Sequence, residues 1–382
     1  MVPQFGKEQM VIEEKPRRKS KLNLSIPDHI RSIDRYSPGK PIEELEQEYG
    51  IVNSIKLASN ENPLGPSPKA IKAILAAVEK LNRYPDGSGC RLIEKISEYY
   101  NVQPSNIVLG NGSDEIISML VRTFLQYGDE VILPKPTFLM YDILARSVGA
   151  TPVYVPLQSL SIDLSRIERK ITAGSKMIFI NNPNNPTGTL VSRRDFENFL
   201  SRVPEEIIVV VDEAYIDFAR DKNCLNSIDY INSGKSLVTL RTFSKAYGLA
   251  GLRIGYGIMP GEIAALLNRL RQPFNTNTLA QVAAVSALDD KVFLKKTIHL
   301  IHEELDYLYD SLNRSKIKYF PTQTNFFLID VKRSANEVYE LMLKEGVIVR
   351  SMASYGFPGY IRVNVGLHKE NMRFLAALKK VI

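Results

Sequence analysis

Cysteine is scarce in this sequence, and long hydrophobic runs are missing from it. The 382 residues contain two cysteines, Cys90 and Cys224, which excludes a disulfide framework and gives no indication of a cysteine-based metal site. No stretch approaches the ~20 continuous apolar residues that a membrane-spanning helix needs. Residues 1–24 also lack the apolar core of a secretory signal. The sequence therefore predicts a cytoplasmic protein without membrane contact.

Positive charge exceeds negative charge, with a formal net charge of +7. Residues 1–24 hold six basic and three acidic side chains, which leaves +4 for the rest of the chain. This composition predicts a flexible basic N-terminal tail. A basic tail can also bind polyanions, so polyanion binding through residues 1–24 is the alternative from a different functional class. Moderate positive charge equally suits an enzyme with anionic ligands, and nucleic acid is not predicted as a partner.

Short apolar runs alternate with helix-length segments between about residues 70 and 260. The runs are Ile107–Leu109, Val131–Leu133, Met177–Ile180, Ile207–Val211, Leu237–Leu240 and Ile254–Ile258. Runs rich in Val and Ile at this spacing predict an α/β fold, with a mainly parallel sheet covered by helices on both faces. In such a sheet the functional loops gather at the carboxyl ends of the strands.

The pattern changes after Pro273. A long helical stretch is expected from Leu279 to about Ser315, before a mixture of short apolar runs and two further helices. This order predicts a smaller α+β domain. We therefore expect four parts, which are a flexible tail (1–24), an N-terminal arm with a small-domain segment (25–69), a large ligand-binding domain (70–272) and a small C-terminal domain (273–382).

Three patterns resemble ligand-binding motifs but fail on their own spacing. The segment 234–236 (Gly-Lys-Ser) lacks the glycine five residues earlier that a phosphate-binding P-loop needs, since position 229 is Asp. The Gly-x-Gly segments 110–112 and 255–257 are not followed by the third glycine of a dinucleotide-binding loop. The histidines of segment 299–303 do not have the order of a zinc-protease site, and no metal is predicted.

Two polar motifs follow predicted strands and allow two interpretations each. Segment 110–115 (Gly-Asn-Gly-Ser-Asp-Glu) opens an apolar periodic helix, where Ser113 is the expected N-cap and free N–H groups attract a phosphate. An ordinary capped helix is the alternative. Segment 181–188 (Asn-Asn-Pro-Asn-Asn-Pro-Thr-Gly) has a fixed backbone and several amide groups. It either presents these groups to a ligand or forms a tight turn without one.

Charged residues follow the next two strands. Asp212 and Tyr215 come at the end of one strand, and an anionic Asp beside a cleft needs a cationic partner. The run 242–253 (Thr-Phe-Ser-Lys-Ala-Tyr-Gly-Leu-Ala-Gly-Leu-Arg) follows the other strand, so Lys245 should project into the same cleft. A lone lysine after a strand is usually a solvated surface residue. Hydroxyl groups before Lys245 and Arg253 eight residues after it make this run far more specific.

With these residues the sequence resembles the fold-type I pyridoxal-phosphate-dependent aminotransferases, and most narrowly the histidinol-phosphate aminotransferases. The resemblance extends from about Ile26 to the C-terminus. It is carried by Leu57–Pro66, Arg83–Gly87, Asn181–Gly188 and the segments around Asp212 and Lys245. It implies a fold-type I transferase with a large and a small domain, pyridoxal 5'-phosphate as cofactor, and a homodimer with shared active sites.

The resemblance also implies individual roles. Lys245 carries the cofactor as a Schiff base and moves the substrate proton, and with Asp212 and Tyr215 it forms the catalytic set. Asp212 pairs with the pyridine nitrogen, whereas Asn185 and Tyr215 bond the phenolic oxygen. Phe138 stacks on the ring face. The residues implied around the cofactor phosphate are Gly112, Ser113, Asp114, Thr242, Ser244 and Arg253, with Tyr84 reaching it from the other subunit.

The implied substrate pocket contains two arginines. Arg362 receives the anionic group of the substrate, Arg350 lies at a nearby strand end, and Tyr36, Asn60 and Asn325 complete the pocket. Forked guanidinium groups suit a phosphate monoester or a carboxylate. The implied reaction is amino-group transfer between L-histidinol phosphate and 2-oxoglutarate, giving imidazole acetol phosphate and L-glutamate in histidine biosynthesis. An aromatic amino-acid aminotransferase and a threonine-phosphate decarboxylase are alternatives with the same fold.

Overall fold

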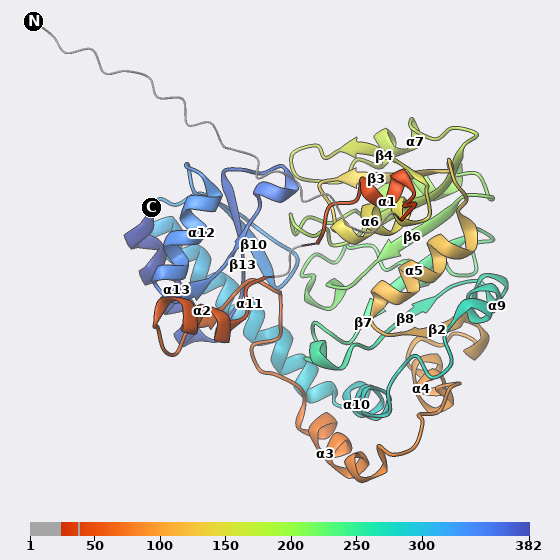
Figure 1. The fold of residues 1–382 in the computed structure, drawn as a ribbon, viewed down its shortest axis with the longest axis horizontal. Coiled ribbons are helices and arrows are strands. Elements are labelled where there is room, and N and C mark those ends of the chain that lie inside the picture. Colours follow the sequence, from red (N-terminus) through yellow and green to blue (C-terminus); the bar gives the residue numbers. More distant parts are fainter. Residues whose placement is uncertain (1–23, 37–38) are drawn as a thin grey trace, which may run out of the picture.

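The computed structural model describes residues 24–36 and 39–382, so the tail predicted over 1–24 lies outside the described residues except for Leu24. The described chain contains two larger sheets, each packed against helices (Figure 1). One sheet and its helices occupy the right of that view, and the other lies on the left beside the C-terminus. This is the α/β architecture that the alternating apolar runs predicted.

The larger sheet has seven strands. They are β2 (Ile107–Gly110), β3 (Glu130–Lys135), β4 (Thr151–Pro156), β5 (Ser175–Asn181), β6 (Ile208–Asp212), β7 (Leu237–Thr242) and β8 (Gly255–Ile258). Their spatial order is β2, β8, β7, β6, β5, β3, β4. Neighbours between β4 and β7 are parallel, whereas β8 is antiparallel to both β2 and β7. All six predicted runs are strands, and the sheet is mostly parallel as expected.

Both faces of this sheet are buried, because successive strand residues point to opposite sides. Val209 and Val211 pack toward α7 (Leu164–Glu168) and α8 (Arg193–Arg202) on one face. Ile208 and Val210 share a core with the helices of the other face. Those helices are α5 (Ser113–Phe124), α6 (Leu139–Ser147) and α9 (Gly261–Leu270). Full burial of each such side chain contributes about 1.5–3 kcal/mol to the stability of the fold. A shift of the strand register by one residue would exchange the two faces, so it is strongly disfavoured.

The smaller sheet is antiparallel and has four strands. They are β9 (Tyr319–Phe320), β10 (Phe326–Asp330), β12 (Arg350–Ser351) and β13 (Tyr360–Asn364), in the spatial order β12, β13, β10, β9. Three helices share its buried core, namely α11 (Lys291–Arg314), α12 (Ala335–Lys344) and α13 (His368–Val381). This mixture agrees with the α+β character predicted after Pro273.

The helix expected from Leu279 to about Ser315 is interrupted. α10 (Thr278–Leu288) ends at Leu288, and α11 begins at Lys291. Asp290 is the N-cap of α11, and its carboxylate accepts a hydrogen bond of 3.3 Å from the backbone N–H of Phe293. Aspartate bonds free N–H groups at a helix start better than it fits the middle of a helix, so the Asp289-Asp290 pair marks a boundary.

The N-terminal segment connects the two sheets. α1 (Asp28–Arg31) contacts α6, and α2 (Ile42–Tyr49) buries Leu45 against Leu343 and Ile348. β1 (Ile55–Lys56) then pairs in parallel with β11 (Val347–Ile348). The chain continues into α3 (Pro68–Ala77) and α4 (Cys90–Tyr100). Short 3₁₀ turns complete the fold: η1 (Val78–Lys80), η2 (Pro104–Asn106), η3 (Ile216–Phe218), η4 (Ser227–Tyr230), η5 (Ala250–Leu252) and η6 (Ala353–Tyr355). Among the helices of residues 24–36 and 39–382, none combines the length and apolar character needed to cross a membrane.

Candidate active site

A cavity of about 200 Å³ lies at the carboxyl ends of β5, β6 and β7. The first turn of α5 forms another part of its wall. The predicted site residues that line it are Tyr36, Ser113, Asp114, Phe138, Asn185, Asp212, Tyr215, Thr242, Ser244, Lys245 and Arg253. The structure therefore brings together side chains from six segments of the sequence.

Lys245 lies in the loop after β7 and lines this cavity. Its Nζ donates a hydrogen bond of 3.1 Å to the backbone oxygen of Ser59 and lies 5.7 Å from the centre of the Tyr215 ring. Burial, assisted by the positive charge of Arg362, lowers the pKa of the lysine amino group to about 8. A neutral amine is a nucleophile and a proton acceptor, so this residue is suited to covalent and acid–base chemistry.

Asp212 is the last residue of β6 and is almost completely buried. Its Oδ2 accepts a hydrogen bond of 2.6 Å from the hydroxyl of Tyr141, and its Oδ1 accepts one of 3.1 Å from the backbone N–H of Ala214. Burial raises the pKa of this carboxyl group to about 6, while these two hydrogen bonds oppose the increase. Both protein donors are neutral, so the carboxylate is well placed to pair with a cationic group of a ligand.

Arg362 and Asn185 form a buried pair beside the cavity. Nη1 of Arg362 donates to Oδ1 of Asn185, and its Nη2 donates to the backbone oxygen of Ala58 at 2.8 Å. Its Nε is buried and, among the described residues, has no hydrogen-bond partner. Burial also lowers the pKa of Arg362, while the guanidinium group lies near the hydroxyl-bearing rings of Tyr355 and Tyr215. A desolvated guanidinium with a free N–H is suited to an anionic ligand.

Asn60 and Asn325 lie behind the cavity wall. The side-chain amide of Asn60 donates to the hydroxyl of Tyr215 at 2.9 Å, and that of Asn325 donates to the backbone oxygen of Asn60 at 3.1 Å. Each amide oxygen is buried without a partner among the described residues. The hydroxyl of Tyr215 accepts from Asn60, so its own hydrogen is free to be donated into the cavity.

The start of α5 and Arg253 face one another at the other end of the cavity. Gly112 is the N-cap, with a φ of +78°, and Ser113 is the first helical residue rather than the expected cap. This φ favours glycine, and a Cβ at Gly112 would lie 2.6 Å from Nη2 of Arg253 and displace the guanidinium group. Arg253 also reaches Oγ of Ser244 and Oδ2 of Asp114, at 3.4 Å each. The first N–H groups of a helix together with a guanidinium form an anion site.

The antiparallel pairing of β8 with β2 and β7 explains why Arg253 lies beside the start of α5. Gly110 at the end of β2 pairs with Gly255 at the start of β8, and Gly255 also pairs with Thr242 at the end of β7. Because β8 runs in the opposite direction, Arg253, two residues before its start, lies at the same edge as residues that follow β2 and β7.

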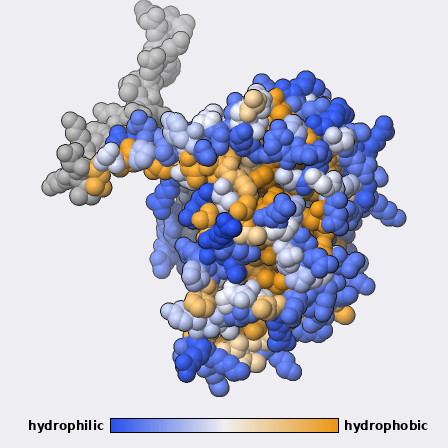
Figure 2. Space-filling model, turned by 90° about the vertical axis from the view of Figure 1, so that its right-hand side faces the viewer, coloured by the Kyte–Doolittle hydropathy of each residue, from blue (hydrophilic) through white to orange (hydrophobic). Residues whose placement is uncertain are grey.

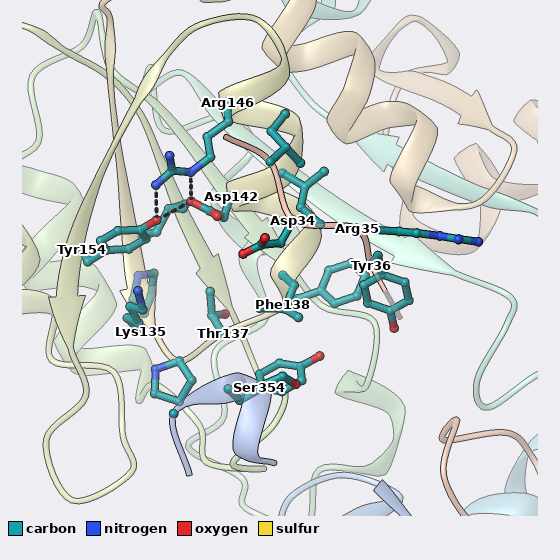
Figure 3. Close-up of a pocket in the computed structure, with 18 of the residues that line it drawn as sticks. Asp34, Arg35, Tyr36, Lys135, Thr137, Phe138, Asp142, Arg146, Tyr154 and Ser354 are labelled. Carbon is teal, nitrogen blue, oxygen red and sulfur yellow. Dashed lines mark hydrogen bonds and ion pairs between the residues drawn. The ribbon is translucent and has the colours of Figure 1, made fainter. Parts of the chain in front are cut away.

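A larger cavity of about 650 Å³ shares Tyr36 and Phe138 with the smaller one. Arg350 lines the larger cavity, with its guanidinium carbon 6.0 Å from the centre of the Tyr36 ring. Across this cavity from Tyr36, Tyr154 bonds both Asp142 and Arg146 of α6 (Figure 3). The predicted substrate residues Tyr36 and Arg350 therefore lie beside a space wide enough for a small molecule.

Tyr84 does not line either of these cavities in its own chain. Its side chain is 81% exposed and stacks on Phe274, with the ring centres 4.6 Å apart. Its predicted contact with the cofactor of another subunit stays a prediction.

Sequence reasoning did not single out three polar residues of this region. Asn181, at the end of β5, lines the cavity and donates from its amide to the backbone oxygen of Asp212 at 3.0 Å. Its place directly after an apolar run was a signal that could have found it. Tyr141 lies in α6, and Arg241 makes a buried ion pair of 2.7 Å with Glu213. No local pattern marks either of them, because tertiary packing alone brings them to β6.

The described part of the chain holds no cluster of three or more potential metal ligands. The fold and the lysine-centred site are those of an aminotransferase scaffold. The family model for aminotransferase class I and II matches residues 52–378, and the chain belongs to this family.

Individual relatives narrow the similarity to the histidinol-phosphate aminotransferases. The chain is 48% identical over 360 residues to the enzyme of that name from Desulfotalea psychrophila, covering 94% of this chain and 95% of the relative. It is 43% identical to the one from Moorella thermoacetica, covering 92% of both chains. The crystal structure of the histidinol-phosphate aminotransferase from Sinorhizobium meliloti, in complex with pyridoxal-5'-phosphate, is similar with a TM-score of 0.87 at 26% identity, covering 95% and 98% of the two chains.

Proposed function

We propose that this protein transfers an amino group between L-histidinol phosphate and 2-oxoglutarate, with pyridoxal 5'-phosphate as its cofactor. The observation that carries the proposal is the arrangement of one cavity, where Lys245, Asp212 and the anion site at Arg253 face a common space. The names of the similar enzymes and the cofactor of the Sinorhizobium meliloti structure support the same reaction.

The residues present fit this cofactor. The helix start at Ser113, with Ser244 and Arg253, forms a site for its phosphate group, and the glycine at 112 keeps that site open. Asp212 offers an anion to the ring nitrogen. Asn185 and Tyr215 offer side-chain hydrogen-bonding groups for the phenolic oxygen, and Phe138 offers an apolar face. When bound, pyridoxal phosphate supplies an electron-withdrawing ring that accepts the electron pair of a deprotonated substrate carbon.

Lys245 would perform two tasks. Its Nζ would hold the cofactor covalently in the absence of substrate. Once free, the same nitrogen would accept the proton from the substrate carbon and donate it to the cofactor. The lowered pKa of its amino group, about 8, increases the neutral fraction that both tasks require. The ring of Tyr215 lies near the Nζ of Lys245, and the hydrogen bond from Asn60 fixes the position of the Tyr215 hydroxyl.

On the substrate side, Arg362 and Arg350 would bind the anionic group, which is the phosphate of histidinol phosphate or a carboxylate of 2-oxoglutarate. The free Nε–H of Arg362 and the burial of its guanidinium group suit a substrate group that carries a full negative charge. Tyr36 lies between the two cavities and would close the pocket around the substrate. Asn60 and Asn325 act by holding Tyr215 and the adjoining backbone.

An exposed apolar surface supports a homodimer with shared active sites. It is formed by Ile71, Leu75, Val78, Leu81, Tyr84, Leu270 and Phe274, each at least 38% exposed. Arg271, at the end of α9, donates to the backbone oxygen of Gly87 at 2.8 Å, which joins the α9 part of this surface to the part before α4. Figure 2, which faces the side where α9 lies, shows hydrophobic residues gathered among hydrophilic ones. Exposed apolar surface of this kind marks interfaces between proteins, and Tyr84 within it would reach the partner's cofactor phosphate.

The four-part division and a cytoplasmic location belong to the same proposal. The two sheets, each packed against its own helices, support a large domain over 70–272 and a small domain over 273–382. The pairing of β1 with β11 supports the assignment of part of 25–69 to the small domain.

The proposal is tested by the absorbance spectrum of the cofactor-loaded protein. Histidinol phosphate should abolish the band of the covalently held cofactor, and 2-oxoglutarate should restore it. Lys245→Ala should lack this band, whereas Lys235→Ala, a lysine whose Nζ bonds the backbone oxygen of Val203, should keep it. A band that responds to phenylalanine or tyrosine but not to histidinol phosphate would instead identify an aromatic amino-acid aminotransferase. Release of carbon dioxide from threonine phosphate would identify a decarboxylase.

A further inference from the structure

Tyr141 is a fully buried tyrosine that the proposed reaction does not use. It lies in the first turns of α6, and its ring stacks on Phe179 of β5 with the ring centres 4.6 Å apart and an angle of 12°. The edge of the Phe138 ring meets it at 5.5 Å and 83°. Its hydroxyl donates to Oδ2 of Asp212 at 2.6 Å. The ring is therefore fixed by packing, and the hydroxyl has one defined acceptor.

Burial and two neighbouring carboxylates oppose the ionisation of Asp212. Its own burial has the largest effect, and the carboxylates of Asp114 on α5 and of Glu213 beside it in the chain act in the same direction. Tyr215 and Lys245 line the same cavity from the loops after β6 and β7. Against these effects stand two hydrogen bonds, one from the backbone N–H of Ala214 and one from Tyr141.

We propose that Tyr141 is a positioning residue for the cofactor, whose hydroxyl keeps the Asp212 carboxylate ionised and fixed in one position, where it would pair with the ring nitrogen. The proposal rests on the proposed function, because it assumes that Asp212 pairs with that nitrogen. A hydrogen bond donated to a carboxylate stabilises the charged form over the neutral form. The same tyrosine also supports Phe138, so the contact to the ring nitrogen and the contact to the ring face depend on one side chain.

The effect of removing the hydroxyl depends on pH. In the cofactor-free protein, burial has already raised the pKa of Asp212 to about 6, and loss of a donor raises it further. A shift of about one pKa unit makes the ionised, binding-competent fraction about tenfold smaller at a pH well below both values, and leaves it nearly unchanged at a pH well above them. A residue that supports the fold alone would change cofactor affinity by the same factor at every pH.

The matched pair of variants is Tyr141→Phe and Tyr256→Phe. Both tyrosines are at most 1% exposed, and each loses one hydroxyl bond, since Tyr256 bonds the hydroxyl of Tyr100 at 2.7 Å, outside the cavity. The dissociation constant of pyridoxal phosphate is measured by absorbance for the cofactor-free wild type and both variants from about pH 5.5 to about pH 8.5, on either side of the expected pKa values. Circular dichroism establishes that each variant is folded.

For Tyr141→Phe we expect a loss of affinity that is about five- to tenfold near pH 5.5 and disappears toward pH 8.5, as a shift of about one pKa unit requires. For Tyr256→Phe we expect the ratio to the wild type to stay constant. A loss for Tyr141→Phe that is equal at all pH values overturns this inference. The variant Asp212→Asn tests the proposed role of Asp212 separately from that of Tyr141. If Asp212→Asn binds the cofactor as tightly as the wild type, the proposed role of Asp212 is itself wrong.

Discussion

Gly248→Ala should destabilise the protein through the loop that carries Lys245. Gly248 has a φ of +70°, and a Cβ there would overlap the backbone oxygen of Gly65 and lie 2.6 Å from its carbonyl carbon. The backbone conformation costs about 1 kcal/mol for a residue other than glycine, and the forced backbone displacement costs about 1–3 kcal/mol more. The free energy of unfolding should therefore fall by about 2–4 kcal/mol. The backbone N–H of Gly248 donates to the backbone oxygen of Lys245 at 3.1 Å, so a displacement here should lower cofactor affinity as well.

The matched control is Gly251→Ala, three residues later in the same loop. A Cβ at Gly251 has no atom within 4 Å, and its φ is not in the left-handed region. Urea unfolding of the cofactor-free variants, followed by circular dichroism, compares their midpoints, and equilibrium dialysis compares their affinity for pyridoxal phosphate. Equal midpoints for Gly248→Ala and Gly251→Ala would refute the reasoning, because the two changes add the same methyl group and differ only in backbone conformation and space.

Three further predictions concern a buried charge, an amine and a surface. Arg241→Met leaves the carboxylate of Glu213 buried without its cation, so urea unfolding should show a loss of about 3–5 kcal/mol, part of which Arg241→Met combined with Glu213→Gln recovers. The lowered pKa of Lys245 means that its amine is mostly protonated below pH 8 and neutral above it. Capture of pyridoxal phosphate by the cofactor-free protein should therefore accelerate as pH rises through about 8, and a stopped-flow rate without pH dependence would contradict this. Leu75→Glu on the apolar surface should convert a dimer into a monomer in light scattering, whereas Val52→Glu, at a residue with similar exposure, should not.

Strands in the centre of the large sheet could be predicted because both of their faces are buried. β6 reads as a continuous apolar run for that reason. β4 was not predicted, since it lies at the sheet edge, has mostly partly exposed side chains and contains Pro152 and Pro156. The reversed direction of β8 could not be predicted from its composition either. It depends on how the 243–254 connection turns, which is a matter of tertiary packing.

The site could be predicted where a residue directly follows a strand. Asp212 ends β6, Asn185 and Lys245 follow β5 and β7, and the three meet because parallel strands end together. Tyr141 belongs to a helix 71 positions before Asp212, and nothing in its local sequence indicates their hydrogen bond. Asn60 was expected in the substrate pocket, and the structure shows its amide bonded to Tyr215 instead of lining either cavity.

The hydrogen bonds of the 57–60 segment have a consequence for biosynthesis on the ribosome. The backbone of Ala58 bonds Arg362, and that of Asn60 bonds the side chain of Asn364, each across 304 positions of the chain. β1 likewise cannot pair until β11, its partner strand, has been synthesised. Contacts over such separations form only after the later residues have been translated. The 57–60 segment behind the cavity wall therefore takes its final position late, although it emerges from the ribosome long before its partners.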